Sequence, residues 1–206
     1  MSLIVSATSE SNFKPVPAGS HLARCYRIID LGTQKTEWQG NIKHQRKIMV
    51  QFEVHGQDDD GYELVTANGE PLSISKNYTL SLGENSGLRK DLKSWRKRDF
   101  TPEELKGFEL KNILGQWAML TVTVSPGKDG REYTNISAIN PVHASVKSAG
   151  LPAFHNKAFM FSISDPDMDL FNTFGDKLKA KITSSPEWQA RSKKSVSAEE
   201  DEDIPF

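Results

Sequence analysis

The chain of 206 residues contains a single cysteine, Cys25, which excludes an internal disulfide and a zinc site built from several thiolates. No apolar run approaches the roughly 18 residues that a membrane-spanning helix needs. The first residues, Met1–Phe13, lack a basic segment followed by an apolar one, so we expect no secretory signal. Together these absences predict a protein of a reducing cytoplasm.

The common catalytic and cofactor-binding patterns are also missing. The five histidines are scattered along the chain and form no pair at helical spacing. There is no phosphate-binding glycine loop, no nucleophile elbow and no dinucleotide fingerprint. The run Asp58-Asp59-Asp60 lacks the ligand spacing of a calcium loop and is typical of a turn. We therefore expect a protein that is not an enzyme and that holds no metal and no cofactor.

What the sequence does contain is an uneven distribution of charge. The 26 lysines and arginines nearly balance the 27 aspartates and glutamates, for a formal net charge of −1. Five of these acids lie in the last stretch, Ser195–Phe206, which has no lysine or arginine. The rest of the chain thus has 26 bases against 22 acids. A mildly basic body with an acidic terminus is typical of a protein with an interaction tail.

Alternating apolar and polar residues predict β-strands in the first two thirds of the chain. Residues 21–31 are rich in β-branched and aromatic side chains, and residues 46–54 alternate strictly. Between them, residues 32–45 read as a polar loop. An Asn-Gly turn predicts that Tyr62–Thr66 folds back on Pro71–Leu82. Two further strands are expected, and they are Gln116–Ser125 and Arg131–Ile139, the latter with Ile136 and Ala138 facing inward.

A helix is expected between the third and fourth strands. Leu88, Leu92 and Trp95 form one apolar stripe on residues 86–98, and Thr101–Glu104 is a capping box that begins a second, short helix. Five strands with a helix in this position is the order of an OB-fold, a small Greek-key barrel. The same elements can also build another small barrel or an α+β sandwich. The predicted fold class is mainly β, a five-stranded OB-fold barrel.

The character of the sequence changes after Pro141. Apolar residues recur at helical spacing from Met168 to Ile182, so this segment either packs back on the barrel or pairs with another subunit. Pro166 and Pro186 fit helix starts. The predicted organisation is an irregular lead-in (1–20), an OB-fold domain (21–140), a linker (141–158), an amphipathic helical segment (159–191) and a disordered acidic tail (192–206).

The terminus itself has the chemistry of a hook for other proteins. Its acids are steered toward basic surfaces over a long range, and Pro205 stiffens the approach. Phe206 offers both an aromatic ring for an apolar pocket and a free carboxylate for a cation. An acidic run alone is usually only a solubilising tail, but apolar residues placed after the acids favour binding. The predicted partner-binding residues are Asp201, Glu202, Asp203, Ile204, Pro205 and Phe206.

This terminus resembles the acidic tip of bacterial single-stranded DNA-binding proteins, which ends in acids followed by Ile-Pro-Phe. Residues 23–32 (ARCYRIIDLG) and 88–108 (LRKDLKSWRKRDFTPEELKGF) are similar to single-stranded DNA-binding proteins of bacteriophages. The resemblance implies coating of single-stranded DNA in a bacterial cytoplasm, that of a phage-infected host included. It also implies recruitment of replication, recombination or repair proteins by the tip. The helical segment 159–191 is not part of the ordinary bacterial domain.

Binding of single strands without sequence preference needs cations along a groove and flat rings on which bases stack. The predicted loop 32–45 and the strand that follows it supply basic residues beside a tryptophan, and the fourth and fifth strands supply further rings. The basic helix 86–98 reads as a solvated face, a phosphate track or a dock for the acidic tail. The predicted DNA-binding residues are Lys35, Trp38, Lys43, Arg46, Lys47, Gln51, Arg89, Lys93, Trp117 and Tyr133.

Two functional hypotheses follow from these patterns. In the first, an OB-fold body binds single-stranded DNA, with or without self-association, and the tail recruits partner enzymes. In the second, the protein binds no DNA and acts as a decoy that occupies the pockets of host enzymes that read such a terminus. The basic residues of the body favour the first hypothesis.

Overall fold

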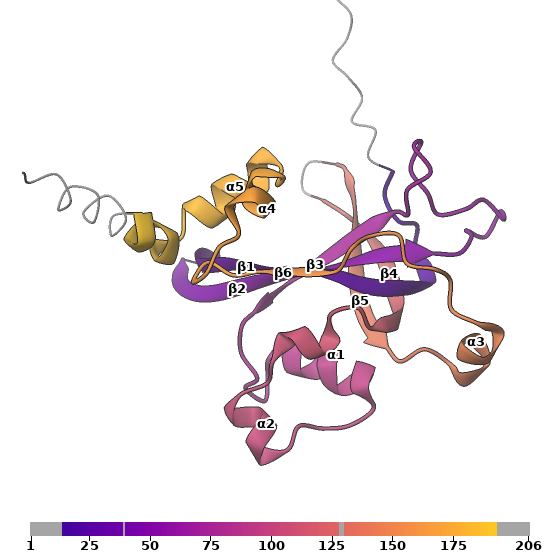
Figure 1. Ribbon diagram of the computed structural model, residues 1–206, viewed down its shortest axis with the longest axis horizontal. Coiled ribbons are helices and arrows are strands. Elements are labelled where there is room, and N and C mark those ends of the chain that lie inside the picture. The colour runs from indigo at the N-terminus through magenta and orange to yellow at the C-terminus, as the bar shows by residue number, and fades with distance from the viewer. Residues whose placement is uncertain (1–13, 39, 128–129, 193–206) are drawn as a thin grey trace, which may run out of the picture.

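The computed structural model describes residues 14–38, 40–127 and 130–192. In this part of the chain six strands form one open sheet, shown in Figure 1. Five pair antiparallel in the order β3-β2-β1-β4-β5, and β6 pairs parallel with β1. The strands are β1 (Gly19–Trp38), β2 (Asn41–His55), β3 (Ser73–Thr79), β4 (Trp117–Pro126), β5 (Glu132–Asn140) and β6 (Phe159–Phe161). The fold is therefore mainly β, as the sequence predicts.

Helices lie on both sides of this sheet. In Figure 1, α1 and α2 lie on one side, and α4 and α5 lie on the other. None of the helices in the described part has the length and apolar character needed to cross a membrane. The helices are α1 (Gly87–Arg96), α2 (Pro102–Lys106), the 3-10 helix η1 (Leu110–Ile113), α3 (Ala144–Ala149), α4 (Met168–Asn172) and α5 (Asp176–Thr183). Residues 186–192 are helical as well, beginning at Pro186 as predicted.

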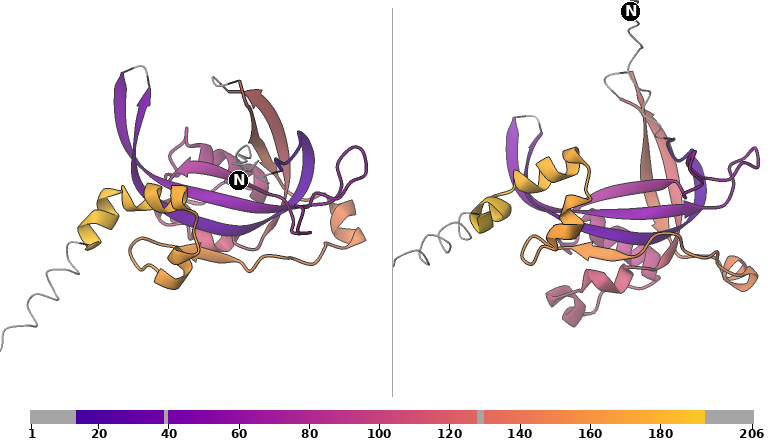
Figure 2. Two further views of the ribbon diagram at one scale, coloured as in Figure 1. Left: turned by 90° about the horizontal axis from the view of Figure 1, so that it is seen from above. Right: turned by 45° about the horizontal axis from the view of Figure 1, so that its top comes forward.

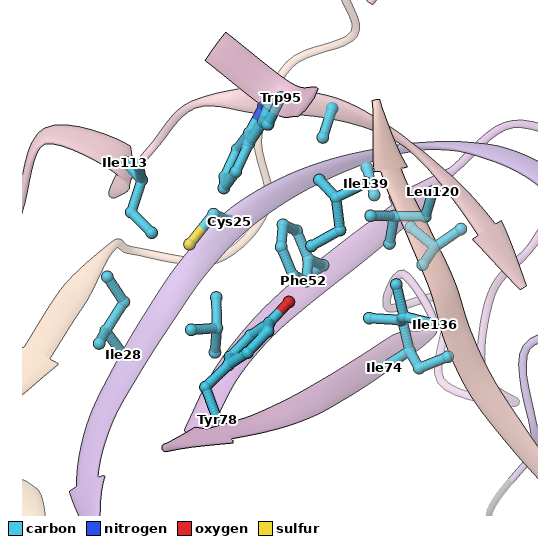
Figure 3. Close-up of a cluster of buried hydrophobic side chains, with 14 of the residues drawn as sticks. Cys25, Ile28, Phe52, Ile74, Tyr78, Trp95, Ile113, Leu120, Ile136 and Ile139 are labelled. Carbon is cyan, nitrogen blue, oxygen red and sulfur yellow. The ribbon is translucent and has the colours of Figure 1, made fainter. Parts of the chain in front are cut away.

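The first core lies between the sheet and α1. Leu88, Leu92 and Trp95 are buried, so the predicted apolar stripe of this helix is confirmed. Figure 3 shows Trp95 beside Cys25 and Phe52, and the rings of Phe52 and Trp95 lie 5.6 Å apart. Burial raises the pKa of the Cys25 thiol to about 12, as expected for a cysteine that acts as a small apolar residue. The predicted capping box of α2 is present as well, with Thr101 and Glu104 bonding each other's backbone.

The prediction of a loop over residues 32–45 is wrong. Strand β1 continues to Trp38, β2 begins at Asn41, and the register runs without a break from Thr33↔Arg46 to Trp38↔Asn41. The backbone ladder of a two-stranded ribbon does not require apolar side chains, which is why the polar composition was misleading. We call Thr33–Lys47 the hairpin arm. Figure 2 shows it projecting beyond the rest of the sheet.

The segment after residue 152 folds back on the other side of the sheet. β6 pairs with β1 in the register Arg27↔Phe159 to Ile29↔Phe161, where the predicted helical segment was expected to begin. Behind it, α4, α5 and residues 186–192 bury a second core against β1. Its members are Ile29, Leu31, Phe161, Ile163, Phe171, Phe174 and Ile182. Of the two alternatives left by the sequence, this structure has the segment packed on its own sheet. We call residues 153–192 the C-terminal segment.

Candidate nucleic-acid interface

Strands β2 and β3 present a polar surface on the side of the sheet that faces away from α1. Ile48, Val50 and Phe52 belong to the first core, so the residues between them point to the opposite side. The same alternation holds in β3, where Ile74 and Tyr78 are in the core. We call the resulting surface the polar face. In paired rows it consists of Lys47 and Thr79, Met49 and Asn77, Gln51 and Ser75, and Glu53 and Ser73.

Lys47 and Gln51 of the polar face donate hydrogen bonds to neutral side chains beside them. Lys47 Nζ donates to Thr79 Oγ1 at 2.7 Å and to Gln45 Oε1 at 2.9 Å. Gln51 Nε2 donates to Ser73 Oγ at 3.1 Å. Amide and hydroxyl groups of this kind can donate to and accept from base edges as well as phosphates. Lys47 and Gln51, two of the predicted DNA-binding residues, therefore lie on one continuous surface.

Arg27 borders this face and was missed by the sequence analysis. Its cross-strand partner is Gln51, and its guanidinium lies over the rings of Tyr26 at 5.4 Å, Phe159 at 5.0 Å and Phe174 at 5.9 Å. The Arg27 Nε is buried and makes no hydrogen bond within the described residues. A bulge between Cys25 and Arg27 breaks the alternation of β1, so no regular pattern in the sequence indicates which side Arg27 takes.

Glu53 closes one end of the polar face and fixes the C-terminal segment to it. This carboxylate is fully buried, with Oε2 accepting from the backbone and side-chain nitrogens of Asn156, each at 2.8 Å. Oε1 lies 3.5 Å from Arg24 and 3.3 Å from His55 Nε2. Burial acts to raise the pKa of Glu53, but the Asn156 and His55 donors hold it below its ordinary value. Arg24 in turn lies over the Phe154 ring, 4.4 Å from its centroid. The predicted linker 141–158 is thus anchored at its end.

The hairpin arm carries cations that have no acidic partner. Lys35 and Lys43 are exposed, and no ion pair in the described part of the chain involves Lys35, Lys43 or Lys47. Arg46 differs, because it bonds Asp30 at 2.5 Å and 3.3 Å, and this bond raises the pKa of Arg46 further. The Trp38 side chain lies outside the described part of the structure. The arm therefore joins three unneutralised lysines to the polar face.

The basic helix α1 is on the other side of the sheet, and most of its basic side chains have an acidic partner, with two cations sharing each carboxylate. Lys93 Nζ lies 2.6 Å from Asp99, and Arg89 lies 3.6 Å from the same carboxylate. Arg96 and Arg98 both pair with Glu104. The structure does not bring Arg89 and Lys93 together with Lys47 and Gln51, although all four are predicted DNA-binding residues.

The remaining predicted rings lie on β4 and β5, on the far side of β1 from the polar face. Trp117 is half-buried, 5.0 Å from the His55 ring, and it lines a hollow with Trp95 and Phe108. One alternative for Trp117 from the sequence is packing under the C-terminal helix. The neighbours of Trp117 in the structure are different ones. Tyr133 is exposed on β5, and the β4–β5 hairpin also projects from the sheet in Figure 2. The predicted partner-binding residues, Asp201–Phe206, lie outside the described residues.

The arrangement offers binding groups, and no metal centre occurs in what the structure describes. Among residues 14–38, 40–127 and 130–192, no three His, Cys, Asp or Glu side chains are placed to hold a metal ion. Comparison of the chain with models of protein families gives no match, and comparison with curated proteins gives no match either.

Proposed function

We propose that this protein binds single-stranded DNA without sequence preference and takes part in DNA replication, recombination or repair. The observation that carries the proposal is that three lysines without an acidic partner in the described residues adjoin the polar face, whose most exposed groups are the amide of Asn77 and the hydroxyl of Ser75. Cations without acidic partners attract a polyanion, and the release of its counterions drives association. The polar groups behind them suit varied base edges, which is what binding without sequence preference requires.

The strand order supports an OB-fold reading of the sheet. β1 pairs with both β2 and β4, and α1 lies between β3 and β4 in the chain, as in that fold. The two end strands of the path, β3 and β5, approach each other across the first core. In an OB-fold the nucleic acid crosses the second and third strands, between the loops that join strands 1 and 2 and strands 4 and 5. By this comparison, the polar face corresponds to the second and third strands, and the hairpin arm corresponds to the connection between strands 1 and 2.

The proposal assigns recruitment of partner enzymes to the acidic terminus. Its support is chemical, since five acids followed by Ile204-Pro205-Phe206 suit a basic pocket with an apolar floor. The two tasks are assigned to different parts of the chain, because the body carries the unpaired cations and the terminus carries the acids. A protein that binds no DNA and only occupies such pockets is the alternative, and the DNA titration separates the two.

The test is a titration of a fluorescently labelled oligo-dT with the full chain, followed by anisotropy. We expect tight binding at about 50 mM salt and a log-log salt slope that is clearly negative. A duplex of the same length serves as the control and is expected to bind more weakly. Absence of oligo-dT binding, or equal affinity for the duplex, overturns the proposal.

A further inference from the structure

The C-terminal segment lies directly beside the surface that we propose to bind DNA. Thr33 donates to the Glu187 carboxylate through its backbone N at 2.9 Å and its Oγ1 at 2.5 Å. Gln34 Nε2 donates to the carbonyl of Lys181 at 3.0 Å. The base of the hairpin arm is therefore held by α5 and the helix after it. Both views in Figure 2 show α5 next to the β1–β2 hairpin.

The first sign that this segment contributes to the site is Arg27. Two of the three rings around its guanidinium, Phe159 and Phe174, belong to the C-terminal segment. The faces of these rings attract the guanidinium and hold it in place. They carry no negative charge that would neutralise it. No carboxylate pairs with Arg27 in the described part of the chain, and its Nε has no acceptor. The segment therefore positions an unneutralised cation beside Gln51.

The second sign is the position of Lys181 beside the hairpin arm, because its carbonyl accepts from Gln34, whose cross-strand partner Gln45 accepts from Lys47 Nζ at 2.9 Å. Lys47 comes from β2, and Lys181 comes from α5 of the C-terminal segment. Burial lowers the pKa of Lys47, and the nearby charge of Lys181 lowers it further. No ion pair in the described residues involves either lysine. Two like charges placed together without a counter-ion are relieved when an anion binds between them.

We infer that the C-terminal segment forms one wall of the DNA site, where Lys181 and Lys47 together bind a backbone phosphate and Arg27 binds next to them. This inference rests on the proposed function, and it assigns a role to residues 153–192 beyond covering the sheet. The ligand chemistry is a phosphodiester of a single strand that runs along the boundary between β2 and α5. This part of the site lies outside the OB-fold domain that the sequence predicts for residues 21–140.

The test compares Lys181→Ala with wild type in the oligo-dT titration. Lys181 is exposed, so we expect unchanged thermal unfolding. Loss of one phosphate contact is expected to weaken binding by roughly three- to tenfold near 50 mM salt. It should also reduce the salt slope by about 0.7 for a single strand. The matched control is Lys90→Ala, an exposed lysine on α1, which should change neither quantity.

A second pair of variants tests whether the two lysines act together. The double variant Lys47→Ala/Lys181→Ala is compared with the two single variants, Lys47→Ala and Lys181→Ala. Its loss of affinity is expected to be smaller than the product of the two single losses, because both lysines bind the same phosphate. Arg27→Lys keeps the charge but not the planar contact with the rings, so affinity should fall with little change in slope.

The outcomes separate this inference from the proposed function. If wild type fails to bind oligo-dT, the proposed function fails. If wild type binds and Lys181→Ala retains both its affinity and its salt slope, the function stands and the assignment of this wall is wrong. If Lys90→Ala weakens binding as much as Lys181→Ala does, the effect is one of general charge, and the assignment is again wrong.

Discussion

Helix α1 and the hairpin arm are both rich in lysine and arginine, and they differ in what surrounds these charges. Along α1 and the turn after it, Asp99 and Glu104 each pair with two of the basic side chains. On the arm, Lys35 and Lys43 have no acidic partner in the described structure. A count of cations along the sequence ranks α1 first, whereas the pairing of those cations ranks the arm first. An exposed ion pair adds little to stability, but the acid in it weakens the positive field that a polyanion meets.

The two regions also differ in what they do for the fold. α1 supplies three buried side chains to the first core and seals one side of the sheet. The described side chains of the arm are mostly exposed, and the arm extends beyond the rest of the sheet (Figure 2). Substitutions in the core side chains of α1 should therefore change the stability of the fold, whereas substitutions in the arm should change the affinity for DNA.

The largest effect is expected from Leu92→Ala. Leu92 is buried in the first core, so the cavity left by its truncation should lower the free energy of unfolding by about 2–5 kcal/mol. Denaturant unfolding measures this loss, with the exposed neighbour Lys90→Ala as the control. Oligo-dT affinity of the folded variant should equal that of wild type. A large loss of affinity in conditions where the variant is folded would place α1 in the binding surface.

Glu53→Gln tests how the C-terminal segment is held to the sheet. The buried carboxylate loses its charge toward Arg24 and Asn156, and we expect a loss of about 1–3 kcal/mol in the free energy of unfolding at neutral pH. Because the pKa of folded Glu53 is below its ordinary value of 4.5, its stabilisation is present above that pH and is lost on acidification. The gap between wild type and Glu53→Gln should thus narrow as the pH falls below about 4.5. A gap that stays constant would show that the charge of Glu53 does not hold the segment.

Reversal of charge on the arm should act on binding alone. Lys35→Glu/Lys43→Glu removes two unpaired cations and adds two acids, so oligo-dT affinity should fall by roughly tenfold or more near 50 mM salt. Unfolding should change little, because both side chains are exposed. The matched control is Lys90→Glu/Lys97→Glu at α1, which should stay within about twofold of wild type. Equal losses in the two double variants would abolish the distinction between the regions.

The smallest effect on DNA affinity is expected from removal of Ile204–Phe206. The deletion leaves every cation of the body in place, so oligo-dT binding should be unchanged or slightly stronger. Partner binding, measured by pull-down of replication and repair proteins, should be lost. An added C-terminal tag should mimic the deletion, because it removes the free carboxylate of Phe206. Loss of DNA binding on deletion would contradict the division of tasks.

Those parts of the fold that depend on side-chain periodicity could be predicted from the sequence. Strict alternation located the core side of β2, and the spacing of Leu88, Leu92 and Trp95 located the buried side of α1. Bulges defeat such patterns, because one extra residue reverses the side of all that follow. In β5, Ile136 and Ile139 are the buried residues in place of the predicted Ile136 and Ala138, since the register shifts between Thr121 and Val122.

The candidate site was only partly predictable for the same reason. The alternation of Lys47 and Gln51 with apolar residues placed both on the side away from the core. Arg27 follows a bulge, and Lys181 lies beside the hairpin arm because the C-terminal segment folds back on β1, far along the chain. Contacts between residues so distant in sequence leave no local pattern. Ion pairs such as Lys93 with Asp99 are likewise set by the turn after α1, which periodicity does not describe.

Hydrogen exchange of the backbone amides with and without saturating oligo-dT tests the central claim most directly. If a single strand lies on the polar face and the hairpin arm, amides of Asn41–His55 and Ser73–Thr79 should gain protection, while those of Gly87–Arg96 should not. Protection confined to Gly87–Lys106, with the arm and β3 unaffected, would contradict it.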